Sequence, residues 1–210
     1  MKFLPRKSKK PLKLVILGEG GVGKTTLSKS FTSSSFSPDT KQTIAVEFHS
    51  KLMYDRRSRQ HKLQIWDFGG QEQFKNMGVF REFCIGADAA ILCFDLTDLS
   101  TLFSLPEWLE FIDPKVPRFL IGTKLDLATP EERNFELTPF HRQFQCFTSF
   151  KCSARDAQLV FEIFGAIIDF IDSFKKGTLD PTTNLPVNVS KQTDNVLRSL
   201  GDSIAKVITK

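Results

Sequence analysis

The stretch GEGGVGKT at residues 18–25 constrains the fold of this chain more than any other feature. It follows the apolar run LKLVIL (12–17), which has the length and composition of a buried strand, and it precedes a segment compatible with a helix (24–32). A glycine-rich loop between a strand and a helix turns its backbone amides inward at a helix N-terminus, where they bind phosphate groups. The pattern therefore predicts a phosphate-binding loop within an α/β fold.

The side chains of this loop indicate its chemistry. Lys24 can reach the β- and γ-phosphates of a nucleotide, and the hydroxyl of Thr25 can ligate Mg²⁺. The loop alone does not identify the base, because GGVGKTT also resembles the loop of partition-type ATPases. Those proteins carry an extra lysine just before the two glycines, where this chain has Glu19, so the ATPase interpretation is the weaker one. The predicted phosphate-binding residues are Gly21, Val22, Gly23, Lys24, Thr25 and Thr26.

Apolar runs and helical patterns alternate along the rest of the chain. This alternation predicts βαβ units, and hence a mostly parallel six-stranded sheet with one antiparallel hairpin strand and helices on both faces. Ligands bind such sheets at the carboxyl ends of the strands, where the unusual residues of this chain also fall. Beyond the first unit, strands are expected at 44–54, 61–68, 87–98, 116–124 and 147–154, and helices at 101–112 and 156–174, the latter with Asp156 as N-cap.

At 210 residues the chain is expected to form one domain with tails. No apolar run reaches the length of a membrane span. The cysteines Cys84, Cys93, Cys146 and Cys152 form no CxxC pair and lie in or beside apolar stretches, which indicates a reducing, cytoplasmic compartment. The predicted organisation is a basic N-terminal tail (1–11), a globular domain (12–176), a polar linker (177–192) and an amphipathic C-terminal segment (193–210).

The net charge of +5 comes from one end of the chain. Residues 1–13 hold six Lys or Arg and no acid, which leaves 23 basic against 24 acidic residues elsewhere. The body of the protein therefore lacks the basic surface of a nucleic-acid-binding protein, and no nucleic-acid partner is expected. The tail has two interpretations, a solvated segment or a weak peripheral contact with an anionic membrane. The C-terminal segment can dock on its own domain, on a partner or on a membrane.

Two further loops indicate which base is bound. GTKLDL (122–127) follows a predicted strand and brings Lys124 and Asp126 to its end. The Asp126 carboxylate can accept hydrogen bonds from both N1–H and the 2-amino group of guanine, which adenine does not offer, and the Lys124 stem can lie over the base. In CSAR (152–155), the Ala154 amide can donate to the guanine O6. Together the two loops predict a guanine site.

GEGGVGKT, the threonine of QTI, WDFGGQE, TKLD and CSA occur in the order and spacing of the Ras superfamily of small GTPases, which the chain resembles over residues 12–174. The motifs combine features of several branches of this superfamily and do not identify one of them. Thr123 stands where most of the superfamily has Asn, as in the Rho branch, while Asp-Phe-Gly-Gly-Gln is closest to the Arf form. CFDLTD (93–98) and the tryptophan-containing helix after it are most Rab-like, although no C-terminal prenylation cysteine is present.

The resemblance implies roles for individual residues. Thr43 would close on Mg²⁺ and the γ-phosphate, with a strand-start threonine as the alternative, and Asp67 would be a metal ligand acting through water. Gln71 would orient the attacking water, and Gly70 would meet the γ-phosphate with its amide. Phe36 would pack edge-on against guanine, with a plain core contact as the alternative. The implied catalytic residues are Lys24, Gly70 and Gln71, the metal ligands Thr25, Thr43 and Asp67, and the base-binding residues Thr123, Lys124, Asp126, Ser153, Ala154 and Arg155.

The expected function is a GTP-hydrolysing molecular switch that binds Mg²⁺ with GTP or GDP. The alternatives are a GTP-binding interaction module with negligible hydrolysis and, less favoured, a P-loop ATPase. G-protein α subunits carry an arginine three residues before the metal threonine, where this chain has Thr40, so slow intrinsic hydrolysis is expected. Exchange factors, GTPase-activating proteins and effectors are expected to bind residues 38–54 and 66–80.

Overall fold

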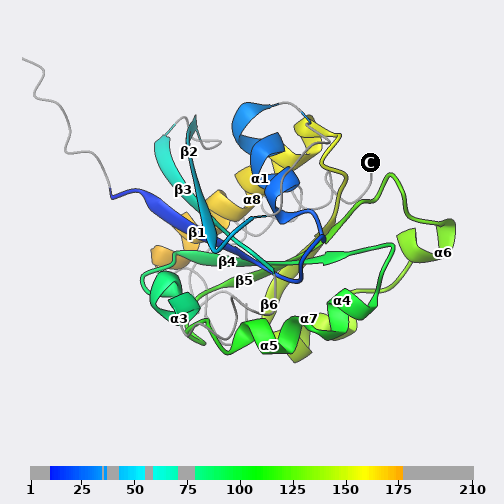
Figure 1. Cartoon of the computed structure of the whole chain (residues 1–210). Coiled ribbons are helices and arrows are strands. Elements are labelled where there is room, and N and C mark those ends of the chain that lie inside the picture. The colour runs from blue at the N-terminus through cyan, green and yellow to red at the C-terminus, as the bar shows by residue number, and fades with distance from the viewer. Residues whose placement is uncertain (1–9, 35, 37–42, 55–58, 71–78, 177–210) are drawn as a thin grey trace, which may run out of the picture.

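The computed structural model describes residues 10–34, 36, 43–54, 59–70 and 79–176. Within them, one six-stranded sheet has the order β2-β3-β1-β4-β5-β6, and its neighbouring strands are parallel except for the antiparallel pair β2 and β3 (Figure 1). The predicted fold class is confirmed. The strands are β1 (Leu12–Leu17), β2 (Val46–Tyr54), β3 (Gln60–Phe68), β4 (Ala89–Asp95), β5 (Arg118–Thr123) and β6 (Cys146–Lys151).

The inner strands are apolar along their length because helices cover both of their faces. β4 reads AAILCFD, and all seven of its residues are buried, as are all six residues of β5. The edge strand β2 differs, because its residues alternate in exposure. Phe48, Leu52 and Tyr54 are exposed on β2, while Met53 is buried.

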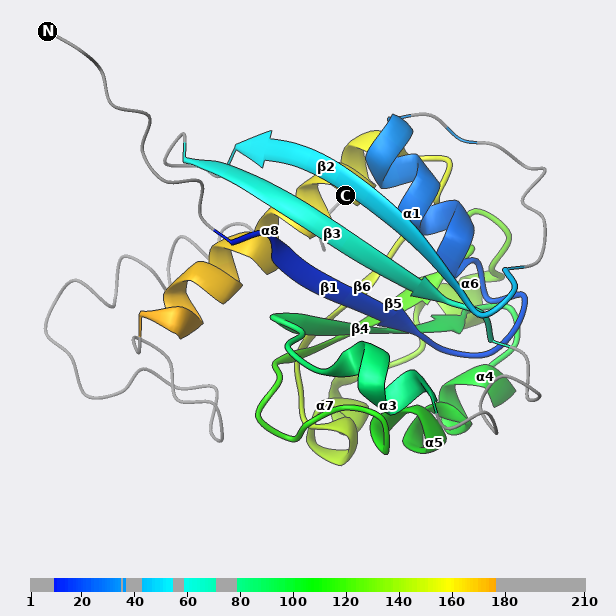
Figure 2. The same cartoon turned by 60° about the vertical axis from the view of Figure 1, so that its left-hand side comes forward.

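Two hydrophobic clusters lie on opposite faces of the sheet. On one face the sheet packs against α1 and α8, where the rings of Phe31 and Phe164 stack with centroids 4.0 Å apart. The other face packs against α3, α4, α5 and α7 (Figure 2). Trp108 is completely buried on this face. The helices are α1 (Lys24–Ser33), α3 (Val79–Cys84), α4 (Ser100–Phe103), α5 (Leu105–Leu109), α6 (Pro130–Arg133), α7 (Thr138–Phe144) and α8 (Ala157–Lys175).

The single helix predicted over 101–112 is instead two short helices, α4 and α5. Ser104 separates them, and Pro106 occupies the first turn of α5. Proline has no backbone N–H to donate to the preceding turn, so it begins a helix readily but interrupts one that is already under way.

The predicted long C-terminal helix is confirmed as α8, with its start fixed by Asp156. The Asp156 side chain accepts a hydrogen bond of 2.9 Å from the backbone N–H of Leu159, as an N-cap does. No helix in the described part of the chain is long and apolar enough to cross a membrane. Most of the basic tail (1–11), the linker (177–192) and the C-terminal segment (193–210) lie outside the described residues.

This topology positions the predicted functional loops. Residues 18–25 follow β1, and the motif that begins at Asp67 lies at the end of β3. Residues 123–126 begin at the last residue of β5, and 152–155 follow β6. These four strands run in the same direction, so their carboxyl ends meet at one edge of the sheet (Figure 1). The chain therefore brings the four loops together at one edge.

Candidate functional site

The phosphate-binding loop is organised around the side chain of Lys24, the first residue of α1. Lys24 is buried, and its ammonium donates hydrogen bonds of 2.8 Å to the carbonyl of Gly18 and 2.6 Å to that of Glu19. The ammonium is thus folded back over the loop, on the side where the β- and γ-phosphates of a nucleotide are expected. Of the other predicted phosphate-binding residues, Val22 is buried, Gly21 is exposed, and Gly23, Thr25 and Thr26 are half-buried.

Beside this lysine, the predicted metal ligands converge. The Thr25 hydroxyl oxygen lies 2.7 Å from the hydroxyl oxygen of Thr43 and donates a hydrogen bond of 2.5 Å to Oδ2 of Asp67. Asp67 is fully buried, and its Oδ1 has no hydrogen-bond partner among the described residues. Burial raises the pKa of Asp67 to about 6 because a charged carboxylate is poorly solvated there. Three side chains from separate segments thus place their oxygens together.

This oxygen cluster fits a magnesium ion. Mg²⁺ prefers hydroxyl, carboxylate and water oxygens, and the cluster offers two hydroxyls and, on the side of Thr25, the Oδ2 oxygen of a carboxylate. The residues that would hold the ion are Thr25, Thr43 and, through water, Asp67.

Two glycines after Asp67 pack closely against neighbouring backbone. A Cβ atom on Gly70 would lie 2.2 Å from both the carbonyl carbon of Glu19 and the nitrogen of Gly20, and a Cβ on Gly69 would lie 2.5 Å from the carbonyl oxygen of Thr43. The Gly69 N–H also donates a hydrogen bond of 2.8 Å to the Ala45 carbonyl. Both positions therefore require glycine for close backbone approach. Gln71, the predicted water-orienting residue, lies outside the described residues.

The predicted guanine loop is tied directly to the phosphate loop by Thr123, at the end of β5. The buried Thr123 hydroxyl lies 2.5 Å from the carbonyl of Val22 and 2.9 Å from that of Phe94. Lys124, the next residue, has a φ of 57°, a left-handed conformation that non-glycine residues rarely adopt. Such a conformation in an otherwise regular fold is typical of a functional position.

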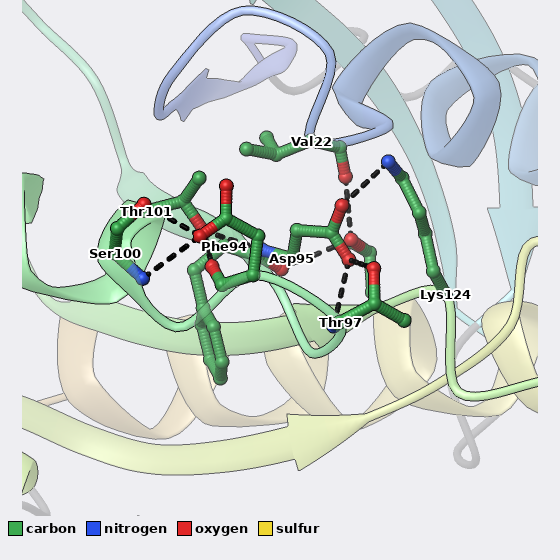
Figure 3. A network of polar contacts seen from close by, with 9 residues as sticks. Val22, Phe94, Asp95, Thr97, Ser100, Thr101 and Lys124 are labelled. Carbon is green, nitrogen blue, oxygen red and sulfur yellow. Dashed lines mark hydrogen bonds and ion pairs between the residues drawn. The ribbon is translucent and has the colours of Figure 1, made fainter. Parts of the chain in front are cut away.

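Asp95, at the end of β4, holds the Lys124 side chain in place. Its Oδ2 lies 2.5 Å from the Lys124 ammonium, while its Oδ1 accepts hydrogen bonds from the backbone N–H and the hydroxyl of Thr97 at 2.9 and 2.7 Å (Figure 3). The backbone N–H of Asp95 donates to the Thr101 hydroxyl at 2.9 Å. Sequence reasoning did not assign Asp95 a role, although its place at the end of an apolar strand was a signal.

Asp126, the predicted guanine-reading carboxylate, forms an ion pair with Arg155. The distance from Asp126 Oδ2 to Arg155 Nε is 3.0 Å, and the Arg155 guanidinium carbon lies 4.5 Å from the ring centroid of Phe36. Phe36 therefore lies at the predicted base site. Ser153 accepts a hydrogen bond of 3.1 Å from the Arg155 backbone N–H, and the Ala154 carbonyl accepts one of 2.7 Å from the Ser30 hydroxyl. The Asp126–Arg155 contact brings the TKLD and CSAR loops to one place.

Another contact that sequence reasoning missed links the phosphate loop to α5. The indole N–H of the buried Trp108 donates a hydrogen bond of 3.3 Å to the Glu19 carboxylate, and the Lys24 ammonium lies 6.0 Å from the Trp108 ring. The only hint in the sequence was a polar residue, Glu19, within the glycine-rich loop. Its partner is 89 positions away.

The predicted partner surfaces are partly described. Within 38–54, the described residues expose large apolar side chains along β2 and just before it. Within 66–80, the described residues include the half-buried Trp66. The Trp66 ring meets that of Phe48 edge-on, with centroids 4.4 Å apart, and the Lys13 ammonium lies 3.7 Å from the Trp66 ring. The exposed apolar side chains are Ile44, Phe48, Leu52 and Tyr54.

The fold and the convergence of these loops are those of P-loop GTPases. A family model described as the Ras family matches residues 13–173. Ras-related protein Rab-12 of Mus musculus is 34% identical over 185 residues, which span 86% of this chain and 74% of that protein. Ras-related protein Rab-30 of Homo sapiens is 35% identical over 156 residues, which span 72% of this chain and 75% of that protein. Ras-related protein Rab-7a of Dictyostelium discoideum is 41% identical over 130 residues, which span 58% of this chain and 62% of that protein.

The chain therefore belongs to the Ras family of small GTPases. These relatives place it in the Rab-like branch, a choice that the mixed Rab-like, Rho-like and Arf-like motifs of the sequence had left open.

Proposed function

We propose that this protein is a molecular switch that binds GTP, hydrolyses it slowly to GDP and phosphate, and presents different surfaces in the two states. The observation that carries the proposal is the meeting of Thr25, Thr43 and Asp67 beside the Lys24 ammonium. Three segments far apart in sequence supply these groups, and together they are suited to hold the phosphates of a nucleotide with a metal ion.

In this proposal each residue has a positioning or electrostatic task. Lys24 leaves the carbonyls of Gly18 and Glu19 and binds the β- and γ-phosphates, where its charge stabilises the transition state. Mg²⁺, held by Thr25 and Thr43, would supply further charge neutralisation at the phosphates. Gly70 offers its amide to the γ-phosphate, and Gln71 orients the water that attacks the γ-phosphorus.

Base recognition is assigned to the opposite end of the site. Asp126 accepts from guanine N1–H and the 2-amino group, the stem of Lys124 covers the base, and the Ala154 amide donates to O6. The ion pair between Asp126 and Arg155 engages one carboxylate oxygen. Guanine therefore has to share the Asp126 carboxylate with Arg155 or displace the Arg155 guanidinium from it.

The switch acts through partners. Thr43 and Gly70 contact the nucleotide and lie within the segments 38–54 and 66–80, so loss of the γ-phosphate would release both segments together. The exposed apolar side chains of β2 suit an effector surface. Exchange factors and GTPase-activating proteins would act on the same segments, and a cytoplasmic protein with weak membrane contact through residues 1–11 is consistent with the sequence.

The decisive experiment identifies the bound nucleotide and measures one turnover. The purified protein should contain GDP or GTP, and single-turnover hydrolysis without partners should run at about 10⁻⁴–10⁻² s⁻¹. Gln71→Leu should slow it further. Bound ATP would contradict the proposal, a rate of order 1 s⁻¹ would contradict slow hydrolysis, and equal rates for both proteins would favour a non-hydrolysing GTP-binding module. Proteins captured by Gln71→Leu and not by Thr25→Asn would be effector candidates.

A further inference from the structure

Glu47, His49 and Asp67 form a cluster on the face of the β2–β3 hairpin that packs toward α1. Glu47 pairs with Asp67 across the two strands, and His49 lies two residues further along β2 on the same face. Each side chain offers one ligand atom, and these atoms all lie within 4.8 Å of one another. Glu47 and His49 lie outside the nucleotide-binding motifs.

Two buried atoms in this cluster lack a hydrogen-bond partner within the described residues. They are Nε2 of His49 and Oδ1 of the fully buried Asp67. The carboxylate oxygen nearest to His49 Nε2 belongs to Glu47 and is 3.7 Å away, too far for a hydrogen bond. Buried polar atoms are nearly always satisfied, so two such atoms in one cluster point to a ligand that contacts both.

We propose that Glu47, His49 and Asp67 form a binding site for a divalent transition-metal ion, of which Zn²⁺ fits best. One imidazole nitrogen and two carboxylate oxygens are typical zinc ligands, and the nitrogen favours Zn²⁺ over Mg²⁺ and Ca²⁺. Zinc bonds of about 2.1 Å in a tetrahedron separate ligand atoms by roughly 3.4 Å. Glu47 and His49 already approach that separation at 3.7 Å, and the three ligand atoms, all within 4.8 Å of one another, have to close by at most about 1.4 Å to reach it.

The surroundings of the cluster suit a cation that binds reversibly. The Glu47 side chain is 39% exposed, which gives an ion a path from solvent and leaves room for a water as fourth ligand. The Lys29 ammonium lies 3.6 Å from the same Glu47 oxygen that faces His49. Lys29 therefore supplies the positive charge in the absence of an ion, and its partly exposed side chain can swing aside when one binds.

The site is separate from the magnesium position. Oδ2 of Asp67 accepts from Thr25 on the nucleotide side, which leaves Oδ1 for the new site. The two sites thus share one carboxylate but take their other ligands from different residues. The inference does not rest on GTP hydrolysis, because the ligand set is defined by the β2–β3 hairpin alone.

The test measures binding of Zn²⁺ and Co²⁺ to the full chain, in the state in which it purifies and with Mg²⁺ in large excess. Titration calorimetry should show one Zn²⁺ site, and Co²⁺ should give the strong visible absorption of a four-coordinate ion. His49→Gln should weaken binding by about tenfold or more. His141→Gln, which removes a histidine bound to Ser149 on the far side of the sheet, should change nothing. Lys29→Gln should tighten binding because it removes the competing ammonium.

Equal Zn²⁺ affinity in wild type and His49→Gln would overturn the proposal, and so would weaker binding in Lys29→Gln. If His49→Gln fails to fold, X-ray absorption of the Zn²⁺-loaded wild-type protein decides the question. One imidazole in the coordination shell, together with a zinc-dependent shift of the His49 Nε2 resonance, supports the site. A shell of oxygen alone, or an unshifted His49, overturns it.

Discussion

The Lys124 ammonium lies 2.5 Å from Oδ2 of Asp95, a contact that joins the ends of strands β4 and β5. Asp95 is buried and is itself fixed by two hydrogen bonds from Thr97 (Figure 3). A lysine has many rotamers, so a rigid carboxylate that selects one of them prepares the stem to cover the base before the nucleotide arrives.

The first prediction concerns this ion pair. Asp95→Asn keeps the shape but removes the charge, so Lys124 should lose its fixed position and GDP should dissociate about tenfold faster, which corresponds to about 1.4 kcal/mol. Release of a fluorescent GDP analogue measures this. Asp98→Asn is the matched control, because Asp98 caps the neighbouring turn through Ser100 without contacting Lys124. Equal release rates for Asp95→Asn and wild type would contradict the assigned role.

The second prediction concerns base selection. Asp126→Ala removes two charge-assisted hydrogen bonds to guanine, so GDP affinity should fall by about 10²–10⁴. Competition titrations with GDP and ADP measure the change and should show discrimination between the two falling by a similar factor. Arg155→Ala separates the partners of the ion pair, because it removes the guanidinium and keeps the Asp126 carboxylate that accepts from guanine. Unchanged discrimination in Asp126→Ala would assign base recognition elsewhere.

The third prediction follows from the raised pKa of Asp67, about 6. Above this pH Asp67 is a carboxylate that attracts Mg²⁺, and below it a proton competes with the ion, so Mg²⁺ affinity should fall as pH drops through 6, by up to tenfold per unit. Magnesium titrations of nucleotide release between pH 5 and pH 7.5 measure this.

The phosphates of GDP also titrate in this range, so Asp67→Asn is the necessary comparison. The variant cannot bind a proton at this position and should show weaker binding with a shallower pH slope. If wild type and Asp67→Asn lose Mg²⁺ with the same slope, the carboxylate has no part in the pH dependence.

The fourth prediction contrasts two glycines. Gly70→Ala places a methyl group 2.2 Å from the backbone of Glu19 and Gly20, so the loops must separate and stability should fall by about 1–3 kcal/mol. Gly165→Ala, in the interior of α8, adds a methyl whose nearest neighbour is the Met53 side chain at 3.9 Å. It should stabilise the protein by about 0.5–1 kcal/mol through helix propensity. Denaturant unfolding of both variants measures the change in the free energy of unfolding. If both substitutions change it in the same direction, the packing argument is contradicted.

The strands, α1 and α8 were predictable from the sequence because each is defined by local patterns. Buried strands appear as apolar runs, the motif at 18–25 fixes the strand–loop–helix unit, and Asp156 marks the start of α8. The short helices α3, α6 and α7 contain four to seven residues, too few for helical periodicity to stand out.

In the candidate site, too, features set by a local motif could be predicted from the sequence, and contacts between distant residues could not. Lys24, Thr25 and Asp126 could be proposed from the sequence because each belongs to a short motif whose spacing carries its chemistry. The contacts between Asp95 and Lys124 and between Glu19 and Trp108 were missed because each joins residues that are distant in sequence. Only the strand order brings such pairs together, and strand order is a property of the whole sheet.

Trp108 and Trp66 give this protein two optical reporters at different places. They are the only tryptophans in the chain, and one is hydrogen-bonded to the phosphate loop while the other lies among the aromatic rings of the β2–β3 hairpin. Indole emission responds to nearby charge and hydrogen bonding. In a Trp66→Phe protein the remaining signal comes from the phosphate loop alone, and in Trp108→Phe from the hairpin alone. The unlabelled molecule can therefore show which of the two regions moves first when nucleotide is exchanged.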